Sequence, residues 1–251
     1  MRVQAPTPTA AATTPPPPPP PRLVVVLDLD NTLVAPVPGW EHAPGPSAFR
    51  VEVLGELGIH RFTVHKRPGV DEFLRELSAR GYEVALFTTA IEDYARQVLE
   101  RLDPHKQVFA HFFHNAHCTQ LRGNAFTKDL AILNRPLSRV VLVDDNLLAC
   151  LKQPSNAIFV PRFLYRKSEP AQDTTLAAVA EFLRDVDGQV DVRPFLKQTF
   201  DLETRLQDKA FLQPSTVSCF FSMCNPPVLQ RSADAQARRK KSKRAADAVA
   251  C

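Results

Sequence analysis

The chain has 251 residues, 44% of them hydrophobic, which is enough for one sizeable folded domain with tails. Its formal net charge is +4, but six basic residues are concentrated at 238–244. Without them Lys+Arg falls from 31 to 25 against 27 acidic residues, so the rest of the chain carries about −2. This balance argues against a basic nucleic-acid-binding domain and predicts no direct nucleic-acid partner.

Both ends of the chain have biased composition. Nine of the first 21 residues are Pro, with an unbroken run at 15–21, which predicts a disordered or polyproline II leader. The leader is a candidate ligand for a Pro-binding module, although a solvated spacer is the simpler interpretation. The basic run at 238–244 is typical of a nuclear localisation signal, with a solvated tail as the alternative. A nuclear location is therefore expected, with the cytoplasm as the alternative.

Cysteine usage and hydropathy restrict the compartment further. The five Cys residues show no paired zinc spacing, and their odd number argues against a disulfide framework. A reducing compartment fits best. The first 21 residues lack the apolar core of a signal peptide, and no apolar stretch is long enough to span a bilayer, so no membrane partner is expected.

A short aliphatic run begins the part of the chain that is expected to fold. Residues 23–26 are Leu followed by three Val, a pattern typical of a fully buried strand. Asp28 and Asp30 follow at the point where this strand should end. In a parallel α/β sheet, ligands bind beyond the carboxyl ends of the strands, and two adjacent carboxylates there are costly without a cation. The pair therefore predicts a metal, phosphate chemistry or both.

Strands and helices then alternate along the chain. Residues 35–45 are rich in Pro and Gly and predict a loop, and residues 47–65 predict a small β-hairpin. Apolar residues at helical spacing predict helices over 70–80, 91–102 and 176–183. Buried strands are predicted over 83–88, 108–113, 139–143 and 157–160. Beyond about residue 200 the pattern fades, and the polar, basic tail from residue 230 is expected to be disordered.

Strands that alternate with helices predict an α/β fold, a three-layer sandwich around a mostly parallel sheet. Acidic or hydroxyl side chains mark three of the strand ends: Asp28 with Asp30, Thr88, and Asp144 with Asp145. If these strands are neighbours in the sheet, their polar side chains meet at one edge.

Such an edge can hydrolyse a phosphate monoester. One carboxylate attacks phosphorus and forms an aspartyl-phosphate, while a second acid protonates the leaving alkoxide and later deprotonates water. Asp28 and Asp30 suit these two roles because residues two apart at a strand end point the same way. Thr88 could donate a hydroxyl hydrogen bond to the phosphate, and Lys128 could supply positive charge.

The remaining negative charge calls for a cation. Mg²⁺ prefers oxygen ligands and often binds substrate phosphate as well, so Asp144 and Asp145 are candidate metal ligands beside Asp28. Each residue also has a simpler interpretation, since Thr88 could be an ordinary strand-end hydroxyl and Lys128 a surface lysine. The joint order of acid pair, Thr, Lys and acid pair favours the catalytic interpretation.

A second cluster of metal-binding residue types lies at 111–118. It holds three His residues spaced three apart and Cys118. A zinc site is one interpretation, but packed or surface imidazoles are the favoured one because the spacing falls on a strand and loop.

The order of these residues resembles that of the haloacid dehalogenase superfamily, whose first motif is Asp-x-Asp-x-Thr. One branch is similar in more detail, the phosphatases of the FCP/SCP and NLI-interacting-factor-like type that act on the C-terminal domain of RNA polymerase II. The stretches that carry this resemblance are 66–74, 86–88, 94–95, 128–130 and 153–157. The small hairpin at 47–65 also fits this branch, which lacks a large cap domain. The resemblance covers about residues 22–186.

The resemblance implies a role for each matching residue. Asp28 would be the nucleophile, and Asp30 would be the acid/base with its backbone carbonyl on Mg²⁺. Thr88 and Lys128 would hold the phosphate. The side-chain metal ligand in this branch corresponds to Asp145. Asp144 would pair with the lysine, and it is retained as a candidate ligand because other superfamily members use the first acid.

The implied function is a Mg²⁺-dependent phosphatase of Ser/Thr-phosphorylated proteins that acts through an aspartyl-phosphate. The implied domains are a leader at 1–21, a phosphatase domain at 22–200 and an extension with a basic tail at 201–251. Two alternatives stay open. One is a non-catalytic binding protein on the same fold, like the related mitochondrial import receptor subunit. The other is a phosphatase of small molecules.

The chain departs from this branch in two places. The stretch 114–118 lacks the Arg that the branch commonly has near the substrate phosphate, and Asn146 and Leu147 replace its usual Ser-Pro. Both changes leave the proposed chemistry intact and favour a substrate other than the polymerase tail.

Overall fold

The structure is a computed structural model that describes residues 21–40, 45–55, 58–121, 125–165 and 173–207. The Pro-rich leader before residue 21, the tail from residue 208 and the basic run at 238–244 lie outside the described residues. The predictions made for these segments therefore stay predictions.

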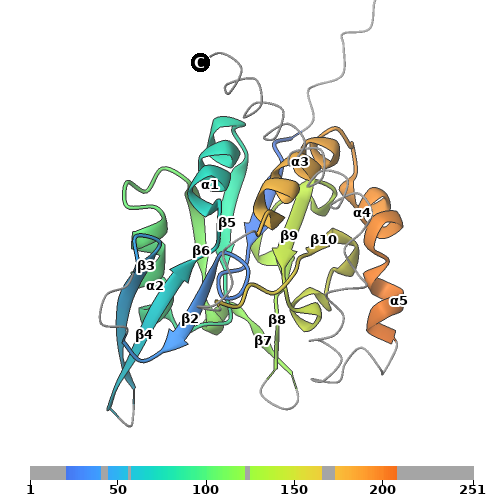
Figure 1. Cartoon of the computed structure of the whole chain (residues 1–251). Helices are drawn as coiled ribbons and strands as arrows, with labels where there is room; N and C mark the ends of the chain where they lie inside the picture. The colour runs from blue at the N-terminus through green and yellow to red at the C-terminus, as the bar shows by residue number, and fades with distance from the viewer. Residues whose placement is uncertain (1–20, 41–44, 56–57, 122–124, 166–172, 208–251) are drawn as a thin grey trace, which may run out of the picture.

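A five-stranded parallel sheet forms the centre of the fold, with helices flanking it (Figure 1). Its strand order is β10-β9-β1-β5-β6. The strands are β1 (Val24–Leu27), β5 (Glu83–Phe87), β6 (Phe109–Phe113), β9 (Val140–Asp144) and β10 (Ala157–Phe159). Every residue of β1 is buried, as expected for the central strand of a sheet that is covered on both faces. The predicted α/β class with a mostly parallel sheet is confirmed.

The strand order reverses direction at β1. From β1 the chain runs outward through β5 to β6, and then returns to the other side of β1 to form β9 and β10. Leu27 pairs with Leu86 of β5 and with Val143 of β9, so the three strands end at nearly the same level. In sheets of this kind a crevice opens at the carboxyl ends of the strands where the order reverses. The first residue beyond β1 at this point is Asp28.

A three-stranded antiparallel sheet occupies the segment between β1 and the first helix. It consists of β2 (Val34–Pro38), β4 (Gly58–Lys66) and β3 (Ala48–Gly55), in that order. The hairpin of β3 and β4 was predicted, but the loop predicted over 35–45 was wrong for its first part. β2 is an edge strand whose one partner among the described strands is β4, and an edge strand tolerates Pro36 because its missing N–H need not join a ladder.

Five α-helices are described, namely α1 (Val70–Ala79), α2 (Glu92–Leu102), α3 (Thr175–Asp187), α4 (Val192–Phe200) and α5 (Leu202–Gln207). The first three were predicted, and the last two were not. Asp191 caps α4 by accepting a hydrogen bond from the Arg193 N–H, and Val192, Leu196 and Phe200 pack into the core. None of the described helices combines the length and apolar character needed to cross a bilayer.

Short elements connect the larger ones. Two short strands, β7 (Thr119–Gln120) and β8 (Phe126–Thr127), form an antiparallel pair outside the main sheet. Among the described residues, 3-10 turns are η1 (Asn115–His117), η3 (Leu130–Leu133), η4 (Leu137–Arg139), η5 (Leu147–Cys150) and η6 (Pro154–Asn156). Of these, β8 and η5 bear directly on the site, because they contact each other at the carboxyl end of β9.

Candidate active site

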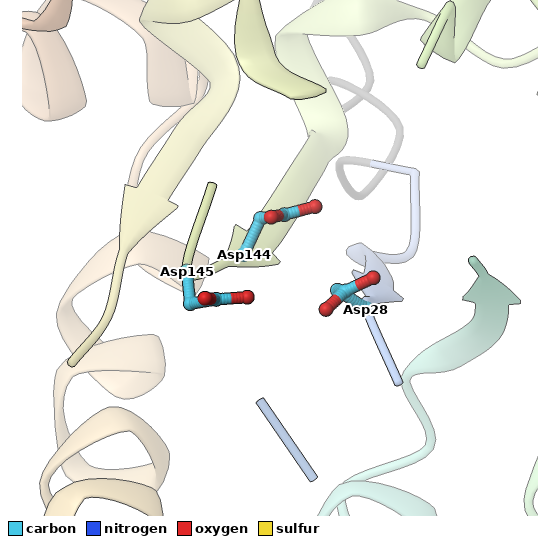
Figure 2. Close-up of side chains that lie close together, drawn as sticks. All are labelled: Asp28, Asp144 and Asp145. Carbon is cyan, nitrogen blue, oxygen red and sulfur yellow. The ribbon is translucent and has the colours of Figure 1, made fainter. Parts of the chain in front are cut away.

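Three buried carboxylates gather where β1 and β9 end. Asp28 follows β1, Asp144 is the last residue of β9 and Asp145 follows it. One oxygen from each of the three lies within 4.8 Å of the others (Figure 2). The register explains their meeting, because Leu27 pairs with Val143 and the Asp28 N–H donates to the Val143 carbonyl at 3.0 Å. The sequence prediction that these acids converge agrees with the structure.

A fully buried lysine lies between two of these acids. Lys128 Nζ donates to Asp28 Oδ1 and to Asp144 Oδ2, both at 2.6 Å. The lysine follows β8, where its own N–H and the Thr127 hydroxyl both donate to the Ala149 carbonyl, at 3.0 and 3.2 Å. This double contact fixes the base of the side chain, so that the long stem can reach the ends of β1 and β9.

Asp145 has a different set of partners. Its Oδ2 lies 3.2 Å from Arg162 Nε, on a side chain that is about half exposed, and its Oδ1 lies 3.5 Å from the Thr32 hydroxyl. Asp144, by contrast, has both oxygens occupied, since Oδ1 accepts from the Asn146 N–H at 2.8 Å and Oδ2 accepts from Lys128. The contacts of Asp145 are longer, and Arg162 is half exposed, so Asp145 is the acid of this pair that is freer to bind a ligand.

The second acid of the first motif faces a tyrosine. Tyr94, near the start of α2, donates from its hydroxyl to Asp30 Oδ1 at 2.6 Å. Asp30 lies in the loop after β1, where a single bridge connects it to Val34. The two aspartates of the motif therefore have different hydrogen-bond partners, Lys128 for Asp28 and Tyr94 for Asp30, although the charge of Asp28 still acts on Asp30.

Thr88 lies at the end of the neighbouring strand, directly after β5. It is buried, and its Oγ1 accepts a hydrogen bond from the Ala90 N–H at 3.0 Å. Because the hydroxyl accepts this bond, its own hydrogen remains available to donate. The Thr88 carbonyl accepts from Cys118 Sγ at 3.6 Å, which packs the 114–118 stretch against this strand end.

Burial, and next to it the charge of neighbouring acids, raises the pKa of Asp30, Asp144 and Asp145. Burial raises the pKa of Asp30 to about 7, which the hydrogen bond from Tyr94 opposes and the charge of Asp28 increases. Burial also raises the pKa of Asp145, and the charges of Asp28 and Asp144 raise it further. Burial lowers the pKa of Lys128, but Asp144 and Asp28 outweigh burial and raise it above the ordinary value, so the lysine stays charged.

The donor set fits a small hard cation. Its ligands are carboxylate oxygens alone, which is the chemistry that Mg²⁺ prefers. Three acids share the site with one buried lysine and the half-exposed Arg162. The buried Arg67 also interacts electrostatically with Asp145, but it is paired with Asp173 at 2.9 Å. A divalent cation would relieve this excess of negative charge.

The histidines at 111–118 are not gathered in the same way. His111 lies 2.6 Å from Glu83, whereas His114 lies 3.4 Å from Glu92 and its ring packs against His117. Within the part of the chain that the structure describes, the only group of acidic, His and Cys ligands close enough to hold a metal is the three aspartates. The favoured interpretation of packed and surface imidazoles agrees with these contacts.

Three residues of the site were not assigned a role from the sequence. Thr32 belongs to the first motif and could have been noticed by its spacing. Tyr94 lies within the helix predicted over 91–102, where nothing in the sequence indicates that its hydroxyl reaches an acid. Arg162 follows β10 at the same edge of the sheet, and only that position could have indicated a place in the site.

Comparison with known proteins gives a consistent result. Residues 23–193 match the protein family described as NLI interacting factor-like phosphatase. CTD nuclear envelope phosphatase 1 of Xenopus laevis is 36% identical over 180 residues, which are 70% of this chain and 71% of that protein. Mitochondrial import inner membrane translocase subunit tim50 of Aspergillus fumigatus is 40% identical over 140 residues, which are 55% of this chain and 26% of that protein.

The fold is also similar to a solved structure. A variant of the fission yeast RNA polymerase II CTD phosphatase Fcp1, bound to beryllium fluoride, superposes with a TM-score of 0.56. The match covers 75% of this chain and 67% of that chain at 17% identity, so it bears on the fold alone.

Proposed function

The chain belongs to the NLI interacting factor-like phosphatase family, and we propose that it is a Mg²⁺-dependent Ser/Thr protein phosphatase that forms an aspartyl-phosphate on Asp28. The family and the Xenopus relative, both named as phosphatases, support hydrolysis of phosphate monoesters. The observation that carries the mechanism is the contact of buried Lys128 with Asp28 and Asp144 beside Asp145, an acid that Lys128 does not contact.

In the first step Asp28 attacks the phosphorus of a phosphorylated side chain. Lys128 occupies Oδ1 of Asp28, which leaves Oδ2 as the attacking oxygen. The new bond joins Oδ2 to phosphorus, and the bond from phosphorus to the Ser or Thr oxygen breaks. Asp30 gives its proton to that leaving oxygen, and its raised pKa of about 7 keeps part of it protonated near neutral pH.

In the second step water attacks the phosphorus of the aspartyl-phosphate. Asp30, now a carboxylate, takes a proton from the water, and inorganic phosphate leaves with regeneration of the Asp28 carboxylate. Thr88, with its hydroxyl hydrogen available at the end of β5, donates to a phosphate oxygen. Lys128 contributes the positive charge next to the same group.

Asp28 and Asp145 would hold the metal ion through their side chains, together with the backbone carbonyl of Asp30. Asp144 is the weaker candidate ligand because Lys128 and the Asn146 N–H already occupy its two oxygens. When bound, Mg²⁺ supplies charge neutralisation between the carboxylates and the incoming phosphate.

The relatives, and not the site, support the substrate class that we propose. We propose that a phosphorylated protein is the substrate and that the chain works in or near the nucleus. The Xenopus relative is named as a nuclear envelope phosphatase, and the basic run at 238–244 is consistent with such a location. The Pro-rich leader remains a candidate ligand for a partner module.

Removing divalent ions is expected to stop hydrolysis. The purified chain should hydrolyse p-nitrophenyl phosphate with Mg²⁺ and lose about 100-fold or more of this rate in a chelator, because a metal supplies several kcal/mol of charge stabilisation. Steady-state release of nitrophenol measures the effect, and re-addition of Mg²⁺ should restore the rate. A rate that is unchanged in the chelator would count against the metal.

The stability of the metal-free protein is expected to fall as pH rises through neutrality. Asp30 has a folded pKa of about 7 and an ordinary value of 3.8, so between these values the folded state binds a proton that the unfolded state has lost. This group therefore stabilises the fold at low pH and loses that contribution as pH rises toward 7. The pKa of Asp145 is also raised, so this acid extends the loss of stability to higher pH.

Thermal unfolding in a chelator, followed from about pH 5.5 to about pH 8, measures this slope. Mg²⁺ should raise the unfolding temperature more at the upper end, where the acids are ionised. Asp145→Asn should flatten the slope because it removes one of the titrating groups. A stability that rises across this range in the chelator would contradict the assignment of raised pKa values.

A further inference from the structure

We infer that Tyr94 is a positioning residue that holds the acid/base Asp30 in one orientation and directs its proton to one oxygen. This inference rests on the proposed function, in which Asp30 protonates the leaving group. Its basis is the hydrogen bond of 2.6 Å from the Tyr94 hydroxyl to Asp30 Oδ1, made across 64 residues of sequence.

Tyr94 is held firmly enough for this role. It is buried near the start of α2, on the face of that helix that packs into the core. Its ring meets the ring of Phe62 from β4 edge to face, with centroids 5.6 Å apart. The Gln97 side chain also donates to the Glu52 carbonyl of β3 at 2.7 Å, which connects α2 to the antiparallel sheet a second time. The phenol therefore cannot turn away without moving the helix or the sheet.

The hydrogen bond determines which oxygen of Asp30 can act. A protonated carboxyl group has one carbonyl oxygen and one hydroxyl oxygen, and the carbonyl oxygen is the better acceptor, so a donor at Oδ1 favours protonation of Oδ2. The proton therefore resides on Oδ2. In the first step the O–H bond at Oδ2 breaks and an O–H bond to the leaving oxygen forms. In the second step Oδ2 takes a proton from water, and Tyr94 keeps its own hydrogen throughout.

A purely structural role for this bond predicts a different result. If Tyr94 only anchored α2, loss of its hydroxyl would slow the hydrolysis of every substrate by the same factor. If it positions the acid, its loss should matter in proportion to the leaving group's need for a proton. Dinitrophenolate leaves readily without a proton, whereas phenolate needs one far more. Comparing these two aryl phosphates separates positioning of the acid from general damage.

The experiment measures kcat/KM of the full chain with Mg²⁺ on 2,4-dinitrophenyl phosphate and on phenyl phosphate. This parameter reports the step in which the leaving group departs. Tyr94→Phe keeps the ring against Phe62 and removes the hydroxyl. It should lower kcat/KM on phenyl phosphate about tenfold and on dinitrophenyl phosphate less than about twofold, as misdirected general-acid catalysis predicts.

Tyr82→Phe is the matched control. Its hydroxyl donates to the Leu183 carbonyl at 3.4 Å, between α3 and the start of β5 and away from the acids. This variant should change neither rate. An equal loss on both substrates in Tyr94→Phe, or no loss on phenyl phosphate, would overturn the positioning role.

Asp30→Asn distinguishes this inference from the proposed function beneath it. Loss of the acid itself should lower kcat/KM on phenyl phosphate far more than on dinitrophenyl phosphate. If Asp30→Asn shows this selectivity and Tyr94→Phe does not, the inference about Tyr94 fails and the role of Asp30 stands. If Asp30→Asn slows both substrates equally, Asp30 is not the acid and the proposed mechanism fails with it.

Discussion

Replacement of Asp28 by Asn is expected to abolish phosphate release while leaving the fold intact. The amide is nearly the same size as the carboxylate but is not a nucleophile, so kcat should fall by at least about 10,000-fold. The amide oxygen can still accept the hydrogen bond that Lys128 now gives to the carboxylate. The loss of one negative charge also relieves Asp30 and Asp145, whose pKa values Asp28 raises. The unfolding temperature should therefore stay close to that of the unaltered protein.

Rapid acid quenching provides a second measurement. The unaltered chain should incorporate phosphate in a form that hydroxylamine releases, as expected of an acyl phosphate, and Asp28→Asn should incorporate none. Asp71→Asn is the matched control, because Asp71 is an exposed acid on α1 that pairs with Lys66. It should retain full activity. Substantial turnover by Asp28→Asn, free of contaminating phosphatase, would rule out the aspartyl-phosphate.

Replacement of Lys128 by Met is expected to cause a large loss of stability. The lysine side chain is fully buried against Asp28 and Asp144, and Met keeps most of its apolar stem without the charge. Removing one partner from a buried ionic group leaves the others uncompensated, which typically costs about 3 to 5 kcal/mol. Urea unfolding of the metal-free proteins at neutral pH measures this difference, and phosphatase activity should be lost as well.

Lys152→Met is the matched control for this variant. Lys152 pairs with Asp129 at 3.1 Å, but both side chains are partly exposed, and such surface pairs contribute less than about 1 kcal/mol. Combining Lys128→Met with Asp28→Asn should recover about 1 to 3 kcal/mol relative to the sum of the two single effects, because the uncompensated charge is then gone. Equal stability losses for Lys128→Met and Lys152→Met would contradict the charge account.

The central sheet and its acids could be predicted because both depend on short-range pattern. A Val-rich run predicts a buried strand, and parallel strands end at one edge, so the amino-acid sequence alone predicts that Asp28 and Asp144 meet. Lys128 carried a weaker signal. It lies outside the main sheet, and its side chain reaches the acids only because Thr127 and Lys128 contact the Ala149 carbonyl. No local sequence pattern predicts that contact.

The elements that were missed contain residues whose local preference opposes the structure. Pro36 favours a loop, yet β2 accepts it because its outer edge has no strand partner. Pro194 disfavours a helix by its local preference, and so α4 was not predicted. It occupies the third position of that helix, where an N–H has no partner within the helix and Pro is tolerated. The helical spacing predicts that Tyr94 lies in a helix, but it does not predict the contact of Tyr94 with Asp30. That contact depends on where α2 lies relative to the end of β1.

The strand order at β1 has a consequence for how this protein folds. β1 finds one neighbour in β5, but its other neighbour, β9, begins more than a hundred residues later in the chain. Until β9 arrives, β1 is an aliphatic strand with an open edge, which is a template for aggregation. Pairings of such long sequence separation form slowly. We therefore expect fragments that end before residue 140 to be insoluble, because their central strand has no second neighbour.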